Sequence, residues 1–378
     1  MPVSKDQELL AFTNCELLDK GNNTTLIKNL SNNKELLVQH EVAIALTHLS
    51  NFKTLEQHSF DLINIFPQLR GDLKGTETVL KSVRDAEMMI NADMTIRYLQ
   101  RESVPRLAPL PSTRIFIITC DRPPALQRLL DSIYAAGQLD RNDSIFVIDN
   151  SRCFKNASEN QEIVETINCD SGKGIIYFGA SLQDRLLKTL LDSIPDEEIG
   201  IRFLIDREKW SFESSYGLSR NLCLLLSVGY RALILDDDIL CEAIKPPLSS
   251  SGLIFGDGSN RKAVFYLSRD QMQENRVQTG FNPLIAHSRI LGTSISTALS
   301  LLQHGPLNQS ALNGSNAAFL SSISADSPIL ISQCGSWGDP GTHNPHWILN
   351  LDEASVAKIV ESREGLSGAL TNRACWVG

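Results

Sequence analysis

The sequence predicts an α/β fold, in which a mostly parallel sheet is flanked by helices and preceded by an N-terminal all-helical region. From residue 113 onward, short apolar runs alternate with segments of helical periodicity, which is typical of a doubly wound sheet. Several of these runs are followed directly by carboxylate residues, at the position where open α/β sheets bind ligands. The first 104 residues instead show helical periodicity and contain almost no proline.

Composition limits the class of protein before any motif is considered. The chain has 378 residues, of which 42% are hydrophobic and 21% charged, and its net charge is −9. These values are ordinary for a globular protein, and the negative charge argues against a nucleic-acid partner. None of the eight cysteines stands in a Cys-x-x-Cys pair, so we expect reduced thiols rather than a zinc site. The sequence shows neither an apolar signal core nor a transmembrane segment, which predicts a cytoplasmic protein.

The N-terminal region, residues 1–104, is expected to form a helical bundle. Its clearest helical patterns cover residues 41–49 and 78–90. Breaks rich in Asn and Ser, at 21–25 and 31–33, are interpreted as separating the helices. The bundle would pack on the domain that follows, and a peptide- or partner-binding role is the alternative.

A proline-rich stretch, residues 105–112, separates this region from the rest of the chain. Three prolines among seven residues exclude a helix and favour a stiff, extended connector. We therefore place a domain boundary here and expect residues 113–378 to form the second domain. We recognise no terminal element at Trp376-Val-Gly, which leaves open that the domain continues beyond this sequence.

The second domain opens with two strand–helix units. Residues 115–118 form the first predicted strand, and Pro123 and Pro124 suit the first turn of the helix after it. The second predicted strand, residues 144–149, ends in a carboxylate, Asp149. The further elements expected before residue 215 are helices at 158–168 and 180–194 and strands at 174–178 and 201–205.

The stretch between residues 217 and 238 organises this domain. Leucines at helical spacing predict a helix over 217–228, and Gly229 stands where a left-handed residue ends a helix. Residues 232–235 form an apolar run of the kind that a central parallel strand needs. The triplet Asp236–Asp238 follows at once. Because a buried strand cannot hold three carboxylates in its interior, they belong at its C-terminal end.

Three adjacent carboxylates at a strand end indicate a divalent cation. They repel one another, and a bound divalent cation would relieve that repulsion. Carboxylate oxygens are ligands that suit Mn²⁺ or Mg²⁺. A solvated acidic turn is the alternative interpretation of the triplet.

The ends of three predicted strands, at 119–122, 149–151 and 236–238, should meet at one edge of the sheet. Asp149 can accept a hydrogen bond from a nucleobase or a ribose hydroxyl. Arg220, on the helix before the triplet, can hold a phosphate by a bidentate contact. Together these residues would bind a nucleoside diphosphate with its metal. The other candidate contacts to the substrate are Thr119, Asp121, Arg122, Asp236 and Asp237.

Four motifs in this order resemble the GT-A glycosyltransferases, especially their bacterial family-2-like branch. Residues 119–123, Thr-Cys-Asp-Arg-Pro, look like the Thr-Tyr-Asn-Arg-Pro opening of that group, and 147–151 look like its Val-Val-Asp-x-Ser strand end. Gly217-Leu-Ser-Arg-Asn resembles its Ala-Arg-Asn helix, and Leu235-Asp-Asp-Asp-Ile resembles the Asp-x-Asp metal motif. The likeness covers residues 114–242, about a third of the chain.

The resemblance implies a GT-A-type, Rossmann-like domain that transfers a sugar from a nucleotide-diphosphate donor to an acceptor that the sequence does not identify. It implies Asp149 at the nucleoside, and Asp236 and Asp238 at the ribose, the diphosphate and the metal. Inverting relatives carry a Glu-Asp pair whose Asp is the general base, and this chain has no such dipeptide. Asp339 is the best substitute as catalytic base, although Asp-Pro-Gly is equally a turn signal.

The loop that contains Asp339 is also expected to help hold the metal. GT-A enzymes often complete the metal shell with a C-terminal histidine, so the resemblance suggests His343 as a ligand, with His346 as the competing choice. Trp337 or Trp347 would cover the sugar. The alternative is that both histidines are simply exposed loop residues.

Two other functions stay open at this point. A nucleotidyltransferase would share the sheet and the metal carboxylates, but it normally has a glycine-rich, cationic loop after the first strand. Residues 119–124 offer only Arg122 there. A binding or scaffolding module that has lost its base is the non-enzymatic alternative, and the missing Glu-Asp pair favours it.

Overall fold

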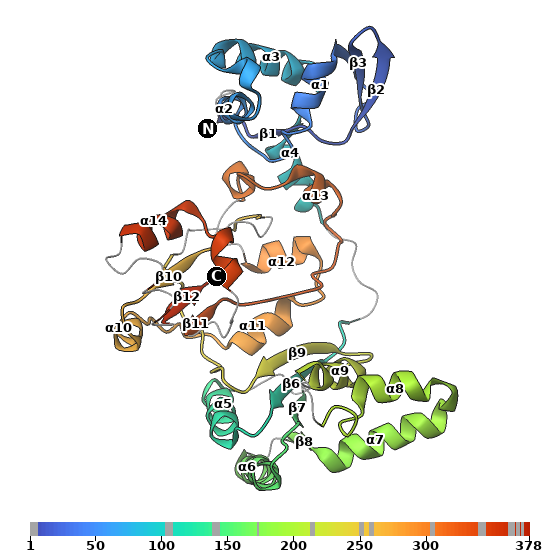
Figure 1. Cartoon of the computed structure of the whole chain (residues 1–378), viewed down its shortest axis with the longest axis vertical. Coiled ribbons are helices and arrows are strands. Elements are labelled where there is room, and N and C mark those ends of the chain that lie inside the picture. Colours follow the sequence, from blue (N-terminus) through green and yellow to red (C-terminus); the bar gives the residue numbers. More distant parts are fainter. Residues whose placement is uncertain are drawn as a thin grey trace.

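The computed structural model describes residues 7–102, 109–137, 144–171, 174–211, 216–248, 253–256, 261–302, 307–338, 345–361, 367, 371 and 374–378. The N-terminal region lies at one end of the molecule and the parallel sheet at the other, and the C-terminal third lies between them (Figure 1). Within the described residues, no helix combines the length and the apolarity needed to cross a membrane.

Four parallel strands form the central sheet, in the order β8-β7-β6-β9. This confirms the predicted α/β domain with a parallel sheet. Strands β7 and β8 extend from one side of β6, and β9 lies on its other side, so the strand order reverses between β6 and β9. Open α/β sheets bind ligands at such a switch point. The strands are β6 (Thr113–Thr119), β7 (Ser144–Asp149), β8 (Ile176–Phe178) and β9 (Arg231–Asp236).

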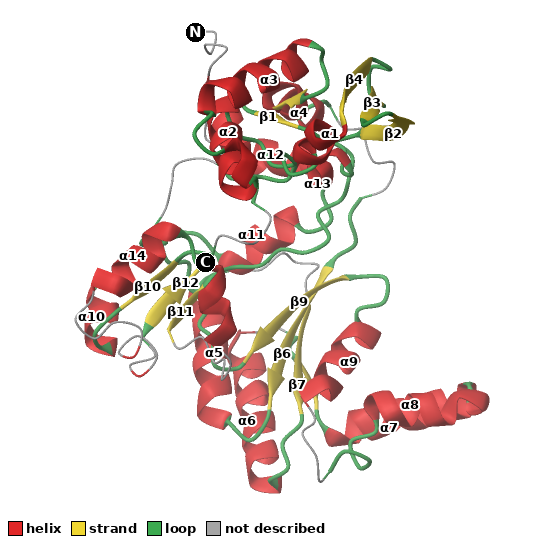
Figure 2. Ribbon diagram, turned by 45° about the horizontal axis from the view of Figure 1, so that its top comes forward, coloured by secondary structure: helices red, strands yellow, loops and turns green. Residues whose placement is uncertain are grey.

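Helices cover both faces of this sheet because its strands are apolar on both sides (Figure 2). Ile115 and Ile117 pack against α5 and α6, whereas Phe116, between them in the sequence, packs against α9. The two faces therefore alternate along β6 with the period of a strand. The flanking helices are α5 (Pro123–Ala135), α6 (Phe154–Ser171), α7 (Ala180–Ser193), α8 (Glu198–Ile205) and α9 (Tyr216–Leu226).

The strand predicted at residues 201–205 is wrong, because these residues belong to α8. A short apolar run does not distinguish a strand from a helix by periodicity alone. Here Arg202 bonds Glu198 and Asp206, each four residues away, which supports the helical conformation. The helix expected at 180–194 is confirmed as α7.

The N-terminal region is not all-helical, because it contains a three-stranded antiparallel sheet of β2, β3 and β4. Asn22 and Asn23 have φ angles of 52° and 60° and connect β2 to β3 in a two-residue turn. The Asn-rich breaks are thus hairpin turns and not helix separators. The elements of this region are β1 (Leu10–Ala11), β2 (Cys15–Gly21), β3 (Thr24–Asn29), β4 (Glu35–Gln39), β5 (Ile90–Asn91), α1 (His40–Leu46), α2 (Leu55–Ile65), α3 (Leu73–Asp85) and α4 (Ala92–Leu99).

The C-terminal third carries a second antiparallel sheet, in the order β10-β12-β11. Its central strand is β12 (Cys375–Val377), where the sequence showed no recognisable element. Trp337 of β11 lies opposite Trp376 of β12. The other elements are β10 (Ala263–Phe265), β11 (Ser336–Gly338), α10 (Arg269–Glu274), α11 (Pro283–Ile290), α12 (Ile295–Leu302), α13 (Ala317–Ser321) and α14 (Glu353–Glu361).

The N-terminal region and the C-terminal third share an apolar cluster. Phe52 of the first packs with Leu312 and Leu320 of the second, and all three are buried. Backbone bonds run both ways between the two segments, from Phe52 N to Ser315 O (2.9 Å) and from Gly314 N to Phe52 O (2.8 Å). The N-terminal region and the C-terminal third therefore share a common core.

Candidate functional site

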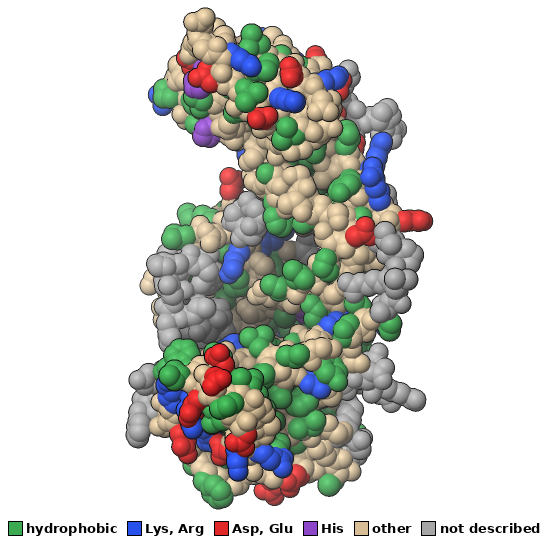
Figure 3. Space-filling model, turned by 90° about the vertical axis from the view of Figure 1, so that its right-hand side faces the viewer, with side chains coloured by type: hydrophobic (Ala, Val, Ile, Leu, Met, Phe, Trp, Pro, Cys, Tyr) green, Lys and Arg blue, Asp and Glu red, His purple; other side chains and the backbone are tan. Residues whose placement is uncertain are grey.

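A large cavity, of about 2250 Å³, opens at the C-terminal edge of β6 and β9. The residues that line it include polar and apolar side chains from the ends of these strands, such as Arg122 and Leu235, and further residues from α11, α12 and 329–338. The surface is visibly hollowed above the part of the molecule that carries α7 and α8 (Figure 3). The sheet side presents Thr119, Asp121, Arg122, Arg220, Asp236 and Asp238.

Strand register brings the first and last of these groups together. Ile118 of β6 pairs with Asp236 of β9, so the two strands end side by side. Residues 119–122 and the triplet Asp236–Asp238 therefore meet at the switch point, as the sequence predicts for parallel strands.

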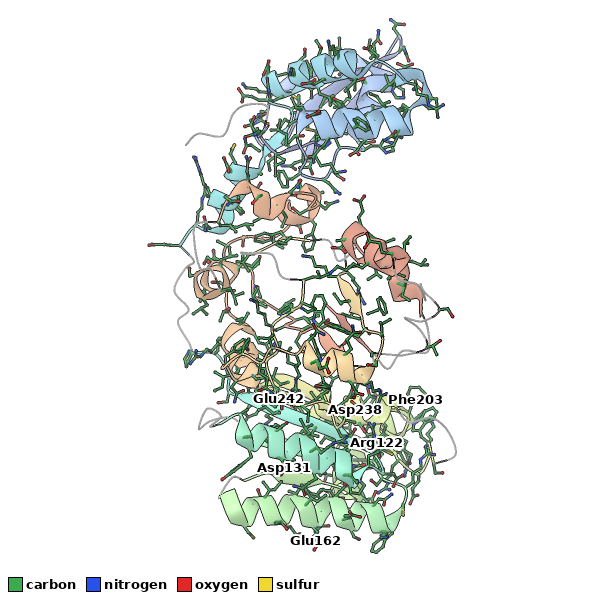
Figure 4. All side chains as sticks on the ribbon, turned by 90° about the vertical axis from the view of Figure 1, so that its left-hand side faces the viewer. Arg122, Asp131, Glu162, Phe203, Asp238 and Glu242 are labelled. Carbon is green, nitrogen blue, oxygen red and sulfur yellow. The ribbon has the colours of Figure 1, made fainter. Side chains whose placement is uncertain are left out.

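Arg122 forms ion pairs with two of the three aspartates, Asp237 and Asp238. Figure 4 shows Arg122 close to Asp238. Its Nη1 donates to Asp238 Oδ2 at 3.1 Å, and its Nη2 forms an ion pair with Asp237 Oδ1 without an aligned hydrogen bond. Asp237 is fully buried and also accepts a hydrogen bond from Thr119 Oγ1 at 2.7 Å. Burial raises the pKa of Asp237, against the effect of the Thr119 hydroxyl and the Arg122 guanidinium. The middle aspartate is thus held inside the protein.

The two outer aspartates face the cavity. The side chains of Asp236 and Asp238 are 53% and 57% exposed. Arg220 Nη2 contacts Asp236 Oδ1 at 3.2 Å, so each outer carboxylate has its own arginine. The edge therefore offers both carboxylates for a cation and guanidiniums for an anion.

Asp121 lines the cavity, but its carboxylate is directed at the start of α6. It accepts hydrogen bonds from Arg152 N (3.1 Å), Cys153 N (3.0 Å) and Asn156 Nδ2 (3.2 Å). Burial alone would raise the pKa of Asp121, but these hydrogen bonds hold it below its ordinary value. The residue has a φ of 56°, a left-handed conformation that Asp tolerates better than most side chains.

Asp149 is buried and already saturated by protein donors. It accepts hydrogen bonds from Ser151 N (2.7 Å), Asn160 Nδ2 (3.0 Å) and the Tyr177 hydroxyl (2.7 Å). It is not among the described residues that line the cavity, whereas the next residue, Asn150, is. The carboxylate that the sequence assigned to the nucleoside is thus committed to holding β7, α6 and β8 together.

A metal ion would find an incomplete set of protein ligands here. In the described part of the chain, no three His, Cys, Asp or Glu side chains lie close enough together to hold a metal. Asp236 and Asp238 nevertheless fit an ion of the Mg²⁺ type, which commonly takes one or two carboxylates and completes its shell with substrate phosphates and water. The residues present thus suit a metal that arrives with a diphosphate.

Several predicted residues cannot be placed. Asp339 and His343 lie outside the residues that the structure describes, and so do the side chains of His346 and Trp347. Trp337 is described and lines the cavity, with its ring 5.7 Å from that of Tyr266.

Sequence reasoning missed many residues of the cavity, Glu242 and His287 among them. Glu242 lies four residues after Asp238 and pairs with Arg276, and His287 lies on α11. Nothing in the surrounding sequence marks His287, because the contacts that bring it to the cavity come from distant segments.

Comparisons with family models, with curated proteins and with solved structures yield no match to this chain. Function is therefore inferred from the chemistry of the site. An edge with three carboxylates and two guanidiniums can bind a ligand that is anionic and accompanied by a cation, as a nucleoside diphosphate is.

Proposed function

We propose that this protein is a metal-dependent glycosyltransferase of the GT-A type, which transfers a sugar from a nucleotide-diphosphate donor to an acceptor. The observation that carries the proposal is the arrangement of Asp236–Asp238 with Arg122 and Arg220 at the switch point of a parallel sheet, on a cavity of about 2250 Å³. The four motifs of residues 114–242 give independent support.

The charges of the edge suit a diphosphate with its cation. Three carboxylates and two guanidiniums leave one net negative charge, which a divalent cation would more than balance. Asp236 and Asp238 would hold Mn²⁺ or Mg²⁺, which acts as a Lewis acid and stabilises charge on the leaving diphosphate. Arg122 and Arg220 are 52% and 51% exposed, so each can exchange its aspartate for a phosphate oxygen.

Asp237 and Thr119 would not contact the ligand but would hold Arg122 in position. The buried Asp237 carboxylate holds the Arg122 guanidinium at the cavity wall, and Thr119 holds Asp237. Trp337 also lines the cavity and would contact the sugar or the acceptor.

A nucleotide-sugar-binding module without transfer activity is the second candidate. One observation favours it: every described carboxylate that lines the cavity already has a hydrogen-bond or ion-pair partner. A nucleotidyltransferase is a third class, which the products of the reaction would reveal.

The proposal is tested by thermal shift and calorimetry with nucleoside diphosphates and nucleotide sugars, with and without Mn²⁺. A ligand at 100 times its Kd stabilises the folded protein by about 2.7 kcal/mol, which is easily measured. We expect Mn²⁺-dependent binding that Asp238→Asn removes, because an amide is a poorer ligand for a hard cation. Asp131→Asn, which changes an exposed carboxylate on α5, is the matched control and should bind as the wild type does.

Two results would count against the proposal. If no nucleotide or nucleotide sugar binds, the proposed donor site is refuted. If Asp238→Asn keeps the full Mn²⁺-dependent binding, the metal is not held by the aspartate triplet. Release of free nucleoside diphosphate from a nucleotide sugar would separate a transferase from a binding module. Release of pyrophosphate from a nucleoside triphosphate and a sugar phosphate would indicate nucleotidyl transfer.

A further inference from the structure

The two outer aspartates of the triplet are paired with two different arginines. Arg220 Nη2 lies 3.2 Å from Asp236 Oδ1, and Arg122 Nη1 donates to Asp238 Oδ2 at 3.1 Å. All four side chains are about half exposed, between 51% and 57%. We call these two ion pairs the paired edge. In the paired edge, the groups that suit a cation and the groups that suit an anion neutralise one another.

The backbone keeps both arginines at this place. Arg220 lies on α9 between Leu218 and Leu222, whose side chains are buried against the sheet together with Phe116. Arg122 follows β6 directly and precedes Pro123, the first residue of α5. Each guanidinium is thus tethered within one side-chain length of the aspartates, and any exchange of its partner has to occur there.

Arg122 has a second and deeper anchor. Its Nη2 pairs with Asp237, whose side chain is fully buried and accepts a hydrogen bond from Thr119 Oγ1 at 2.7 Å. To remove the partner of a buried charge is costly, whereas an exposed ion pair contributes little. Arg122 should therefore keep Asp237 and exchange only its contact with Asp238.

We propose that the paired edge binds its cation and its anion jointly, and that it binds either of them weakly when the other is missing. A cation at Asp236 and Asp238 has to displace both arginines, and the displaced guanidiniums then need anionic partners. A diphosphate supplies those partners, while the metal replaces the arginines at the aspartates. The inference rests on the proposed function and concerns how binding of the metal depends on binding of the donor.

Removal of one member of a pair should have opposite effects on the two kinds of ligand. In Arg220→Gln, Asp236 has lost a competing cation, so the affinity for Mn²⁺ alone should rise. In Asp236→Asn, Arg220 has lost a competing anion, so the affinity for a nucleoside diphosphate alone should rise. Both variants should bind Mn²⁺ and nucleotide together more weakly, because each lacks one contact of the complete site. A merely structural role of the pair would lower all these affinities.

The first test is a titration of the wild type and of Arg220→Gln with Mn²⁺ alone, followed by the EPR signal of free Mn²⁺. We expect Arg220→Gln to bind Mn²⁺ about twofold to fivefold more tightly, the range for one partly exposed ion pair. Arg128→Gln, at an exposed arginine of α5, is the matched control and should bind Mn²⁺ as the wild type does. An unchanged or lower affinity of Arg220→Gln for Mn²⁺ overturns the inference.

The second test is calorimetry of Asp236→Asn with ADP, CDP, GDP, UDP and dTDP. In EDTA this variant should bind the preferred nucleotide about twofold to fivefold more tightly than the wild type does, and in Mn²⁺ it should bind that nucleotide more weakly.

A double-mutant cycle separates the ion pair from a general effect of charge. The gain in Mn²⁺ affinity that Arg220→Gln produces should vanish in the Asp236→Asn background. If the full gain persists there, it reflects net charge alone, and the role of the pair is refuted.

The outcomes distinguish the paired edge from the proposed function. If none of the five nucleotides binds the wild type in Mn²⁺, the donor site is refuted, and the titrations with Mn²⁺ alone still decide whether Arg220 competes for Asp236. If a nucleotide binds in Mn²⁺ and both variants lose affinity for every ligand, the donor site stands and the inference is wrong.

Discussion

The role of Asp121 can be decided by substitution, because the sequence places it at the substrate and the structure places its carboxylate on α6. Asp121→Asn keeps one acceptor oxygen and tolerates the φ of 56° but loses the charge. The cost should be about 1 kcal/mol, since partly exposed charge-assisted hydrogen bonds and the helix dipole each contribute around that amount. Asp121→Ala also loses the acceptor, at about 1 kcal/mol, and removes the polar side chain whose local hydrogen bonds make the left-handed conformation tolerable, at about 1 kcal/mol more.

The assay is hydrogen exchange of peptides from α6, combined with urea unfolding. The folded-state pKa of Asp121 lies below its ordinary value, despite the opposing effect of burial, because of hydrogen bonds from Cys153, Arg152 and Asn156. Its contribution is therefore fully present above the unfolded-state pKa of about 3.9 and is lost as the pH falls through the lower folded-state value. The difference between wild type and Asp121→Asn should be constant from pH 5 to pH 8. Unchanged exchange in α6 together with lost nucleotide binding would show that the carboxylate serves the ligand instead.

Two further predictions concern the framework of the site. Tyr177→Phe removes a 2.7 Å hydrogen bond to the buried Asp149 and should lower the free energy of unfolding by about 1–2 kcal/mol in urea titrations; an unchanged midpoint would mean that water replaces the hydroxyl. Deleting residues 1–102 uncovers Leu312 and Leu320, each worth up to about 1.5–3 kcal/mol of burial, so residues 307–323 should exchange amide hydrogens faster in the fragment than in the whole chain. Equal exchange rates would support the independent second domain that the proline-rich connector suggested.

The sequence alone determined most of the parallel-sheet domain, because the signals involved are local. Apolar runs predicted β6, β7 and β9, and leucine spacing predicted α9. Gly229 has the expected left-handed conformation, with a φ of 80°, but it lies in the turn after α9, which ends at Leu226, two residues before the predicted end. The apolar run before Asp236–Asp238 also predicted that these residues lie at a strand end, and Asp236 and Asp238 do line a cavity there.

Local sequence patterns did not predict the secondary structure correctly where a strand and a helix would bury the same apolar residues. The run at 201–205 is apolar enough for a strand, but its flanking charges and its contact with α7 make it helical. The Asn-rich breaks marked turns correctly without showing that strands rather than helices lay on either side. In both cases the deciding interactions are hydrogen bonds or packing with a neighbouring element.

Only the tertiary structure decided which side chains of the edge face a ligand. Asp121 is bonded to residues 31 and 32 positions away, and Asp149 to Tyr177, 28 positions away. A strand end presents several polar side chains at once, and the partners that each one finds are set by how distant elements pack. The sequence therefore determined where polar groups gather, and the packing determined which of them are free to act.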